Sequence, residues 1–100
     1  MLTQHKLNDF KVTAEFFQVL ANPIRLQIVL ELLEKRLCVH ELTGATGVSQ
    51  PLVSQHLRVL RLAKIITGNR NGKEIIYEVT DDHVSNIIRD ALEHVYEETS

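Results

Sequence analysis

Cysteine is almost absent from this sequence. The single residue Cys38 excludes an intrachain disulfide framework and any metal motif built on two cysteines. Long apolar runs are also missing, because no stretch reaches the about 18 apolar residues that a membrane-spanning helix requires. The first residues lack the basic region, apolar run and small-residue cleavage site of a secretory signal. We therefore expect a cytoplasmic protein without a membrane partner.

The sequence is short, with 100 residues, of which 44% are hydrophobic and 24% charged. These proportions predict one small globular domain spanning residues 1–100, with little room for a second. A domain of this size has a modest core, so a helical surface shared within a dimer would add to its stability.

The net charge of -2 hides an uneven distribution of charge along the chain. Residues 1–48 carry five bases and five acids, and residues 74–100 carry one base and eight acids. The segment between them contains five bases and no acid: Arg58, Arg61, Lys64, Arg70 and Lys73. A locally basic segment inside an acidic protein indicates an anionic partner for that segment.

Apolar residues recur with helical spacing along most of the chain. The pattern predicts five helices, over residues 10–20, 24–36 and 39–46, from Ser49 to beyond Leu60, and from Thr80 to beyond Val95. Asn22 and Ser49 are suitable N-caps, Pro23 and Pro51 fit a first helical turn, and Gly47 closes the third helix.

A β-hairpin is predicted between the last two helices. Asn71-Gly72 lies between the β-prone segments 65–70 and 73–79, and this dipeptide is the strongest short-range hairpin signal. We therefore expect a mainly α protein with a small β-hairpin (α+β), uninterrupted by a linker or a repeat.

The third and fourth predicted helices have the features of a helix-turn-helix. A short turn containing Gly47 joins them, and the second helix begins Ser-Gln-Pro. Leu52, Val53, Leu57 and Leu60 are expected to face mostly inward. The residues left facing outward near the N-terminal half are Gln50, Pro51, Ser54, Gln55 and Arg58. Glutamine pairs with adenine, serine bonds bases or phosphate, and arginine reaches phosphate or guanine.

The hairpin tip, residues 69–73, adds the cations Arg70 and Lys73, which suit contact with the DNA minor groove or backbone. Together these elements predict a winged helix-turn-helix that binds double-stranded DNA. The alternative is a solvated face used for protein contacts, which leaves the acid-free clustering of cations unexplained.

Four segments, LANPIRLQIVLELL, CVHELTGATGVSQPLVSQHLRVLR, NGKEIIYEV and the terminal DDHV with its later His and Glu, resemble the ArsR/SmtB family of bacterial metal-responsive repressors. The resemblance covers the chain from about Phe16 onward. It implies a homodimer built on the first and last helices, promoter binding by the metal-free form, and release when metal binds. It also implies DNA-facing positions for Gln50, Pro51, Val53, Ser54 and Gln55.

Asp81, His83, His94 and Glu97 form a candidate metal-ligand set on the last helix. His83 and His94 lie about 20° apart around an ideal helix, and Glu97 lies about 40° to the other side of His83. Eleven residues rise about 16 Å along the axis, so one helix cannot bring all four side chains to one ion. An antiparallel second copy would set Asp81 and His83 of one chain beside His94 and Glu97 of the other, giving two equivalent sites per dimer.

Two imidazoles and two carboxylates complete a tetrahedral shell, which favours zinc, with cobalt or nickel as further candidates. The alternative is that these four residues are only a solvated edge of the helix. The protein would then be a metal-independent winged-helix DNA-binding or architectural protein.

Other potential ligands are treated separately. In some relatives the third helix and the partner's N-terminal arm supply a second metal site, and here Cys38, His40, Glu41 and His5 occupy those regions. With one thiolate available, a buried structural Cys38 is the preferred interpretation, and a contribution of these residues to a second site stays open. His56 is expected to be packed or hydrogen-bonded rather than a ligand.

The sequence does not favour an enzyme or a small-molecule substrate. No nucleophile with a base and an orienting group can be assembled, and the one His/carboxylate cluster leaves no open coordination position.

Overall fold

The computed structural model of the chain describes residues 6–99, with side chains through Glu97. In chain order the elements are α1 (Leu7–Leu20), α2 (Pro23–Glu34), α3 (Val39–Thr46), α4 (Gln50–Leu62), β1 (Ile66–Asn71), β2 (Glu74–Val79) and α5 (Asp82–Thr99). The fold class predicted from the sequence, a mainly α protein with one β-hairpin, is confirmed.

Several helix boundaries differ from the prediction, among them the start of α2 at Pro23 rather than residue 24 and the start of α5 at Asp82 rather than Thr80. Helix α1 begins at Leu7, before the predicted start, where the Asp9 carboxylate accepts a hydrogen bond from the Lys6 backbone N–H at 3.1 Å. Helix α2 ends at Glu34 rather than at residue 36. The chain becomes extended there because Leu37 pairs with Tyr77 of β2 through two backbone hydrogen bonds, of 3.1 and 2.8 Å.

The N-caps also differ from one another. Asn22 caps α2 as predicted, because its side-chain oxygen accepts from the N–H groups of Ile24 and Arg25 at 2.9 and 3.1 Å. Ser49 occupies the N-cap position of α4, but its side chain makes no capping hydrogen bond. The prediction for Ser49 is therefore correct in its position but not in its side-chain hydrogen bond.

The β1–β2 hairpin is antiparallel, and Asn71 pairs with Glu74. The two turn residues are therefore Gly72 and Lys73, one position later than the Asn71-Gly72 signal suggested. Gly72 has a φ of +69°, which matches a type II′ turn with glycine first. Gly68 has no room for a side chain, because an added Cβ would lie 2.9 Å from Ile75 Cγ2 and 3.0 Å from Tyr77 Cε1.

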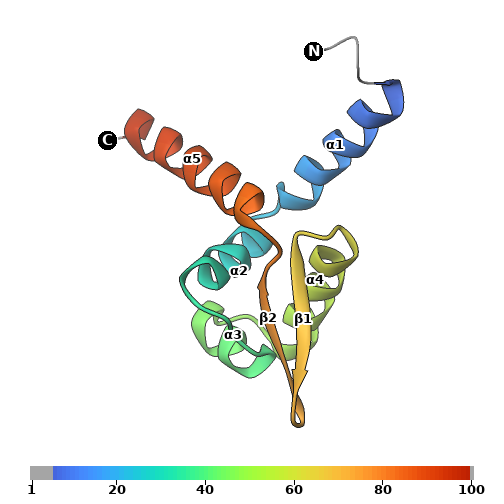
Figure 1. Ribbon diagram of the computed structural model, residues 1–100. Helices are drawn as coiled ribbons and strands as arrows, with labels where there is room; N and C mark the ends of the chain where they lie inside the picture. The colour runs from blue at the N-terminus through green and yellow to red at the C-terminus, as the bar shows by residue number, and fades with distance from the viewer. Residues whose placement is uncertain (1–5, 100) are drawn as a thin grey trace.

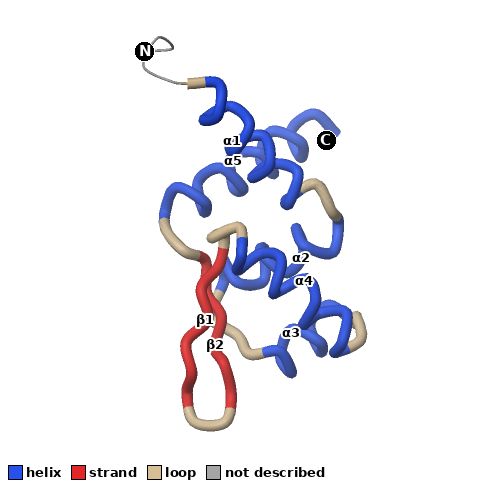
Figure 2. Tube along the Cα trace, turned by 90° about the vertical axis from the view of Figure 1, so that its right-hand side faces the viewer, coloured by secondary structure: helices blue, strands red, loops and turns tan. Residues whose placement is uncertain are grey.

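The core lies where α2, α3, α4 and the hairpin meet. Its buried members are Leu20, Ile28, Val29, Leu32, Leu37, Leu42, Val53, Leu57, Leu60, Ile65, Ile66, Tyr77, Val84 and Ile88. Figure 1 shows α1 and α5 diverging from this body at the end opposite the hairpin tip, and Figure 2 places them at the same end.

No single helix in the described residues is long and apolar enough to cross a membrane, and α1 and α2 reach that length and composition only together, across an 88° bend.

Candidate DNA-binding and metal-binding sites

Helix α4 has one buried and one exposed face. The buried stripe follows helical spacing and consists of Val53, His56, Leu57 and Leu60. The side chains of Gln50, Pro51, Ser54, Gln55 and Arg58 are exposed, as predicted. Two predictions on this helix are wrong. Val53 has 0% of its surface exposed, so the inward position expected from helical spacing is confirmed and the DNA-facing position implied by the resemblance is wrong. Leu52, which was expected to face inward, is 37% exposed.

The turn between α3 and α4 fixes the direction in which α4 leaves the core. Gly47 has a φ of +72° and its N–H donates to the Thr43 carbonyl at 2.9 Å, which closes α3. The Thr46 hydroxyl accepts from the Val48 N–H at 3.2 Å. This turn therefore holds the polar face of α4 outward.

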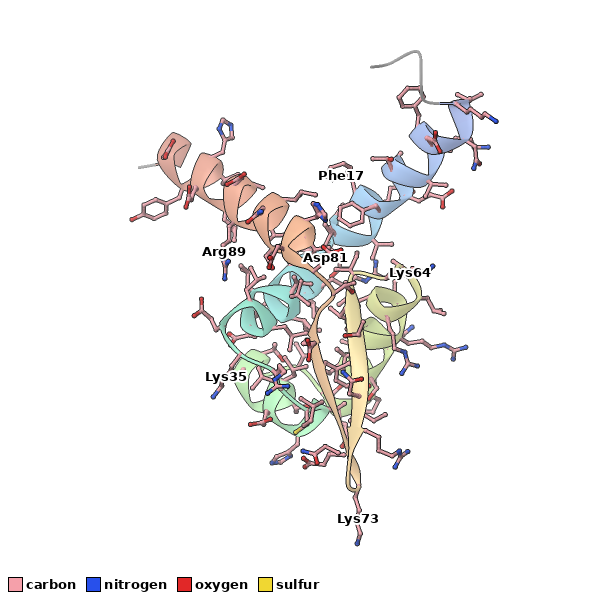
Figure 3. All side chains as sticks on the ribbon, in the orientation of Figure 1. Phe17, Lys35, Lys64, Lys73, Asp81 and Arg89 are labelled. Carbon is pink, nitrogen blue, oxygen red and sulfur yellow. The ribbon has the colours of Figure 1, made fainter. Side chains whose placement is uncertain are left out.

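The hairpin carries the remaining predicted cations. Arg70 is exposed on β1, and Lys73 is exposed in the turn, where Figure 3 shows it at the far tip of the molecule. Exposed cations thus extend from α4 to the end of the hairpin, a distribution that suits the phosphate backbone of DNA.

His56 is held inside the protein by a bond that the sequence did not reveal. Arg25 Nε of α2 donates to His56 Nδ1 at 3.2 Å, and Arg25 Nη1 donates to the Val19 carbonyl of α1 at 3.2 Å. Burial, and then the positive charge of Arg25, hold the pKa of His56 below its usual value. The expectation that His56 is packed and hydrogen-bonded is confirmed, and Arg25 is seen to join α1, α2 and α4.

This arrangement predicts an acid-sensitive contribution to stability. The folded protein binds a proton at His56 less readily than the unfolded chain, because the pKa is lowered in the fold. The contribution is complete above about pH 6.5, the unfolded pKa, and is lost as the pH falls towards the lower folded pKa. The free energy of unfolding, measured with urea, should fall between pH 7.5 and pH 5.5. The fall should be larger in the parent than in His56→Gln, by at most about 1.4 kcal/mol per pH unit. Equal losses in the two proteins would contradict this interpretation.

The four predicted metal ligands fall into two groups along α5. Asp81 accepts a hydrogen bond from the Val84 N–H at 3.1 Å and so caps α5, and its Oδ1 lies 3.8 Å from His83 Nδ1. His83 has 93% of its side chain exposed. His94 and Glu97 are exposed further along the same helix. Nowhere in residues 6–97 do three or more His, Cys, Asp or Glu side chains come close enough to hold a metal ion.

Asp81 and His83 lie near the separation that two ligands of one zinc ion require. Donor atoms on a tetrahedral zinc ion are about 3.3 Å apart, given bonds of about 2.0 Å. The observed 3.8 Å separation of an oxygen and a nitrogen is close to that value. The pair can therefore supply two ligands with a small side-chain adjustment.

An apolar groove runs between α1 and α5. It has a volume of about 290 Å³ and is lined by Phe17, Leu20, Leu26, Ile87, Ile88, Ala91, Leu92 and Val95. Figure 3 shows Phe17 on the side of α1 that faces α5. Phe17 and Leu92 are substantially exposed, so this lining leaves a continuous apolar surface at the end of the molecule opposite the hairpin.

The possible second metal site would involve residues at the start of α3 and in the N-terminal arm. Cys38 is buried, as expected, and its N–H donates to Glu41 Oε1 at 3.0 Å, a bond that lowers the pKa of Glu41. His40 is exposed. His5 lies outside the described residues.

Comparison with known proteins identifies close relatives. Residues 22–67 match the bacterial regulatory protein family arsR. The chain is 48% identical over 84 residues to the transcriptional repressor SmtB of Mycobacterium tuberculosis, covering 84% of this chain and 62% of that repressor's length. It is 37% identical over 91 residues to the SmtB homolog of Synechocystis, covering 91% of this chain and 69% of that protein. Both of these relatives are transcriptional repressors.

Solved structures agree with the sequence comparison. The antimony-specific transcriptional repressor AntR superposes with a TM-score of 0.83 at 28% identity, over 94% of this chain and 86% of that one. A homodimeric winged helix-turn-helix DNA-binding domain from Mycobacterium bovis superposes with a TM-score of 0.78 at 26% identity, over 89% of this chain and 81% of that one. The fold is therefore a winged helix-turn-helix.

Proposed function

Because the chain belongs to the arsR family of bacterial regulatory proteins, which includes the SmtB repressors, we propose that it is a metal-responsive repressor that binds operator DNA as a metal-free homodimer. Zinc, or else cobalt or nickel, binds between the subunits and releases the DNA. The observation that carries the proposal is the joint exposure of the polar face of α4 and of the Asp81–His83 pair at the start of α5.

DNA recognition is assigned to α4, the recognition helix, and to the β1–β2 hairpin, the wing. Gln50 and Gln55 read adenine, Ser54 bonds a base or a phosphate, and Arg58 reaches phosphate or guanine. Arg70 and Lys73 hold the sugar–phosphate backbone from the wing. Pro51 lies in the first turn of α4 beside these residues, and its exposed ring is assigned an apolar contact with DNA.

The homodimer is supported by the apolar groove between α1 and α5 and by the homodimeric relative from Mycobacterium bovis. An exposed apolar surface of this kind is covered in a stable protein, and a two-fold partner presenting the same helices is self-complementary to it.

The metal site is assigned to Asp81 and His83 of one subunit and to His94 and Glu97 of the other. The rise of about 16 Å between the two histidines along one helix requires the second subunit if all four residues hold one ion. The bound ion would supply a crosslink between the two α5 helices. Nitrogen and carboxylate donors favour zinc.

Coupling between metal and DNA runs through the start of α5. The Thr80 N–H donates to the Ile65 carbonyl at 3.0 Å, so the segment before Asp81 is tied directly to the segment that follows α4. Metal release of DNA requires the ion to prefer a dimer in which the two recognition helices are badly spaced for successive major grooves. With an ion bound, His94 would transmit this preference by donating its second ring N–H to a carbonyl near Ala63 and Lys64.

The DNA-binding part is tested by two substitutions with different expected effects. An operator is first selected from a pool of randomised duplexes, and affinities are then measured by fluorescence anisotropy at several salt concentrations. Arg70→Glu should weaken binding to every duplex and flatten the salt slope by about one or more. Gln55→Ala should change the preferred sequence, because the protein loses about 1–3 kcal/mol of discrimination in favour of an adenine at one position. Lys35→Glu, an exposed position after α2, is the control for charge alone. Parent-like binding by both variants would refute the assignment of α4 and the wing.

A further inference from the structure

A cationic hollow lies where the recognition helix ends and the wing begins. It has a volume of about 370 Å³ and is lined by Arg61, Lys64, Ile66, Thr67, Gly68 and Thr80. Two lining residues are cations, two carry hydroxyl groups, and none is acidic. The side chains of all four polar residues are exposed, so their donors are available to a ligand. The chemistry of this lining favours an anion.

A helix-ending turn fixes the two cations next to each other. The Ile65 N–H donates to the Leu60 carbonyl at 3.0 Å, and the Lys64 N–H donates to the Arg61 carbonyl at 3.0 Å. These two bonds form a Schellman motif in which Lys64 occupies the position where glycine is usual. Lys64 accordingly has a φ of +61°, at a conformational cost that glycine would not incur.

Strand β1 adds unpaired backbone groups to the same hollow. Within the described residues the sheet has the order β1–β2, and the bridge to Leu37 is made by β2, so the other edge of β1 is open. An open edge presents backbone N–H groups, which are further donors to an anion. Residues 66–68 of this strand form one wall of the hollow.

The position of the hollow indicates which anion it binds. When α4 lies in the major groove and the wing contacts the neighbouring groove, the sugar–phosphate backbone between the grooves must pass between helix and wing. The hollow lies between the end of α4 and the start of β1, at the base of the wing. We propose that Arg61, Lys64, Thr67 and Thr80 bind one backbone phosphate of the DNA, an inference that rests on the proposed function.

The test compares the salt dependence of DNA binding in matched variants of the whole chain. Arg61→Gln/Lys64→Gln removes both charges but keeps the length of the side chains. Its affinity should fall by roughly three- to tenfold, and by the same factor for the selected operator and for random duplexes. The slope of log affinity against log salt concentration should decrease by about one, the value for one phosphate. Arg61→Lys/Lys64→Arg keeps both charges and should retain the parent's slope. Lys35→Gln removes an exposed lysine that Figure 3 shows on the opposite side of the molecule, and should behave like the parent.

The possible outcomes separate this inference from the proposed function. If the Gln/Gln variant binds DNA with the parent's affinity and salt slope, the phosphate site is refuted, while the assignment of α4 and the wing to DNA is unaffected. A loss confined to the operator also overturns it, because a phosphate contact is independent of sequence. Saturable binding of inorganic phosphate at the hollow by NMR, with DNA affinity unchanged in the Gln/Gln variant, would make it a free-anion site instead. A parent that binds no duplex overturns the proposed function, and this inference with it.

Discussion

Metal-free His94→Ala protein is expected to bind operator DNA as tightly as the parent, yet to remain bound when zinc is added. His94 is exposed on α5 and is not among the residues assigned to DNA, so its removal leaves those residues in place. It also removes one of the four ligands and the ring N–H that transmits the effect. In the parent, zinc should weaken operator binding by about 5–150-fold, the usual range of allosteric coupling. In His94→Ala this factor should fall to about one, measured by anisotropy over a zinc titration.

His83→Ala should give the same result, because it removes a ligand from the other half of the site. His40→Ala is the matched control, since it deletes an exposed histidine of α3 that lies outside the set. If His40→Ala loses release while His83→Ala and His94→Ala retain it, sensing belongs to the α3 region and the α5 site is not the sensor.

The second large effect concerns the apolar surface of α1 and α5. Phe17→Glu/Leu92→Glu places two carboxylates in the apolar groove between these helices. Burying an unpaired carboxylate is costly, so the variant should be monomeric in analytical ultracentrifugation. A monomer contacts one half-site and loses the advantage of linked binding, so operator affinity should fall by about 10²–10⁴-fold.

Leu52→Glu provides the control for oligomeric state. Leu52 on α4 is 37% exposed and Leu92 on α5 is 38% exposed, so the two substitutions add a charge at similarly exposed leucines. The Leu52→Glu variant should remain dimeric. A dimeric Phe17→Glu/Leu92→Glu protein would place the subunit contact elsewhere.

The order of elements was predictable because it depends on local patterns. Helical spacing and the Asn-Gly dipeptide act within a few residues, and each predicted element is present. Boundaries were less predictable, since α2 ends where Leu37 pairs with Tyr77, 40 residues later in the sequence. The edge of the buried stripe on α4 was also misjudged. The buried stripe consists of Val53, His56, Leu57 and Leu60. Helical spacing placed Val53 correctly inside but also placed Leu52 there, because the limit of a buried stripe depends on which neighbouring elements cover it.

The candidate sites were predictable only where their residues are neighbours in sequence. Asp81 and His83 are two residues apart, and their proximity follows from the start of α5. The bond from Arg25 to His56 joins residues 31 positions apart, and the hollow joins Arg61 to Thr80 through tertiary packing. No local signal marks such contacts. The union of the two halves of the metal site depends on a second subunit and stays a prediction.

Mixed dimers of two inactive variants test the central claim, a metal site shared between subunits, most directly. Chains carrying His83→Ala and His94→Ala are given different affinity tags, combined and purified as mixed dimers, and their tight zinc is counted against a chelator. One of the two sites in such a dimer loses both histidines, while the other keeps His83 from one chain and His94 from its partner. The account predicts one tight zinc ion per mixed dimer and none in either homodimer. Mixed dimers without a tight zinc ion would contradict it, because a site within one chain cannot be restored by mixing.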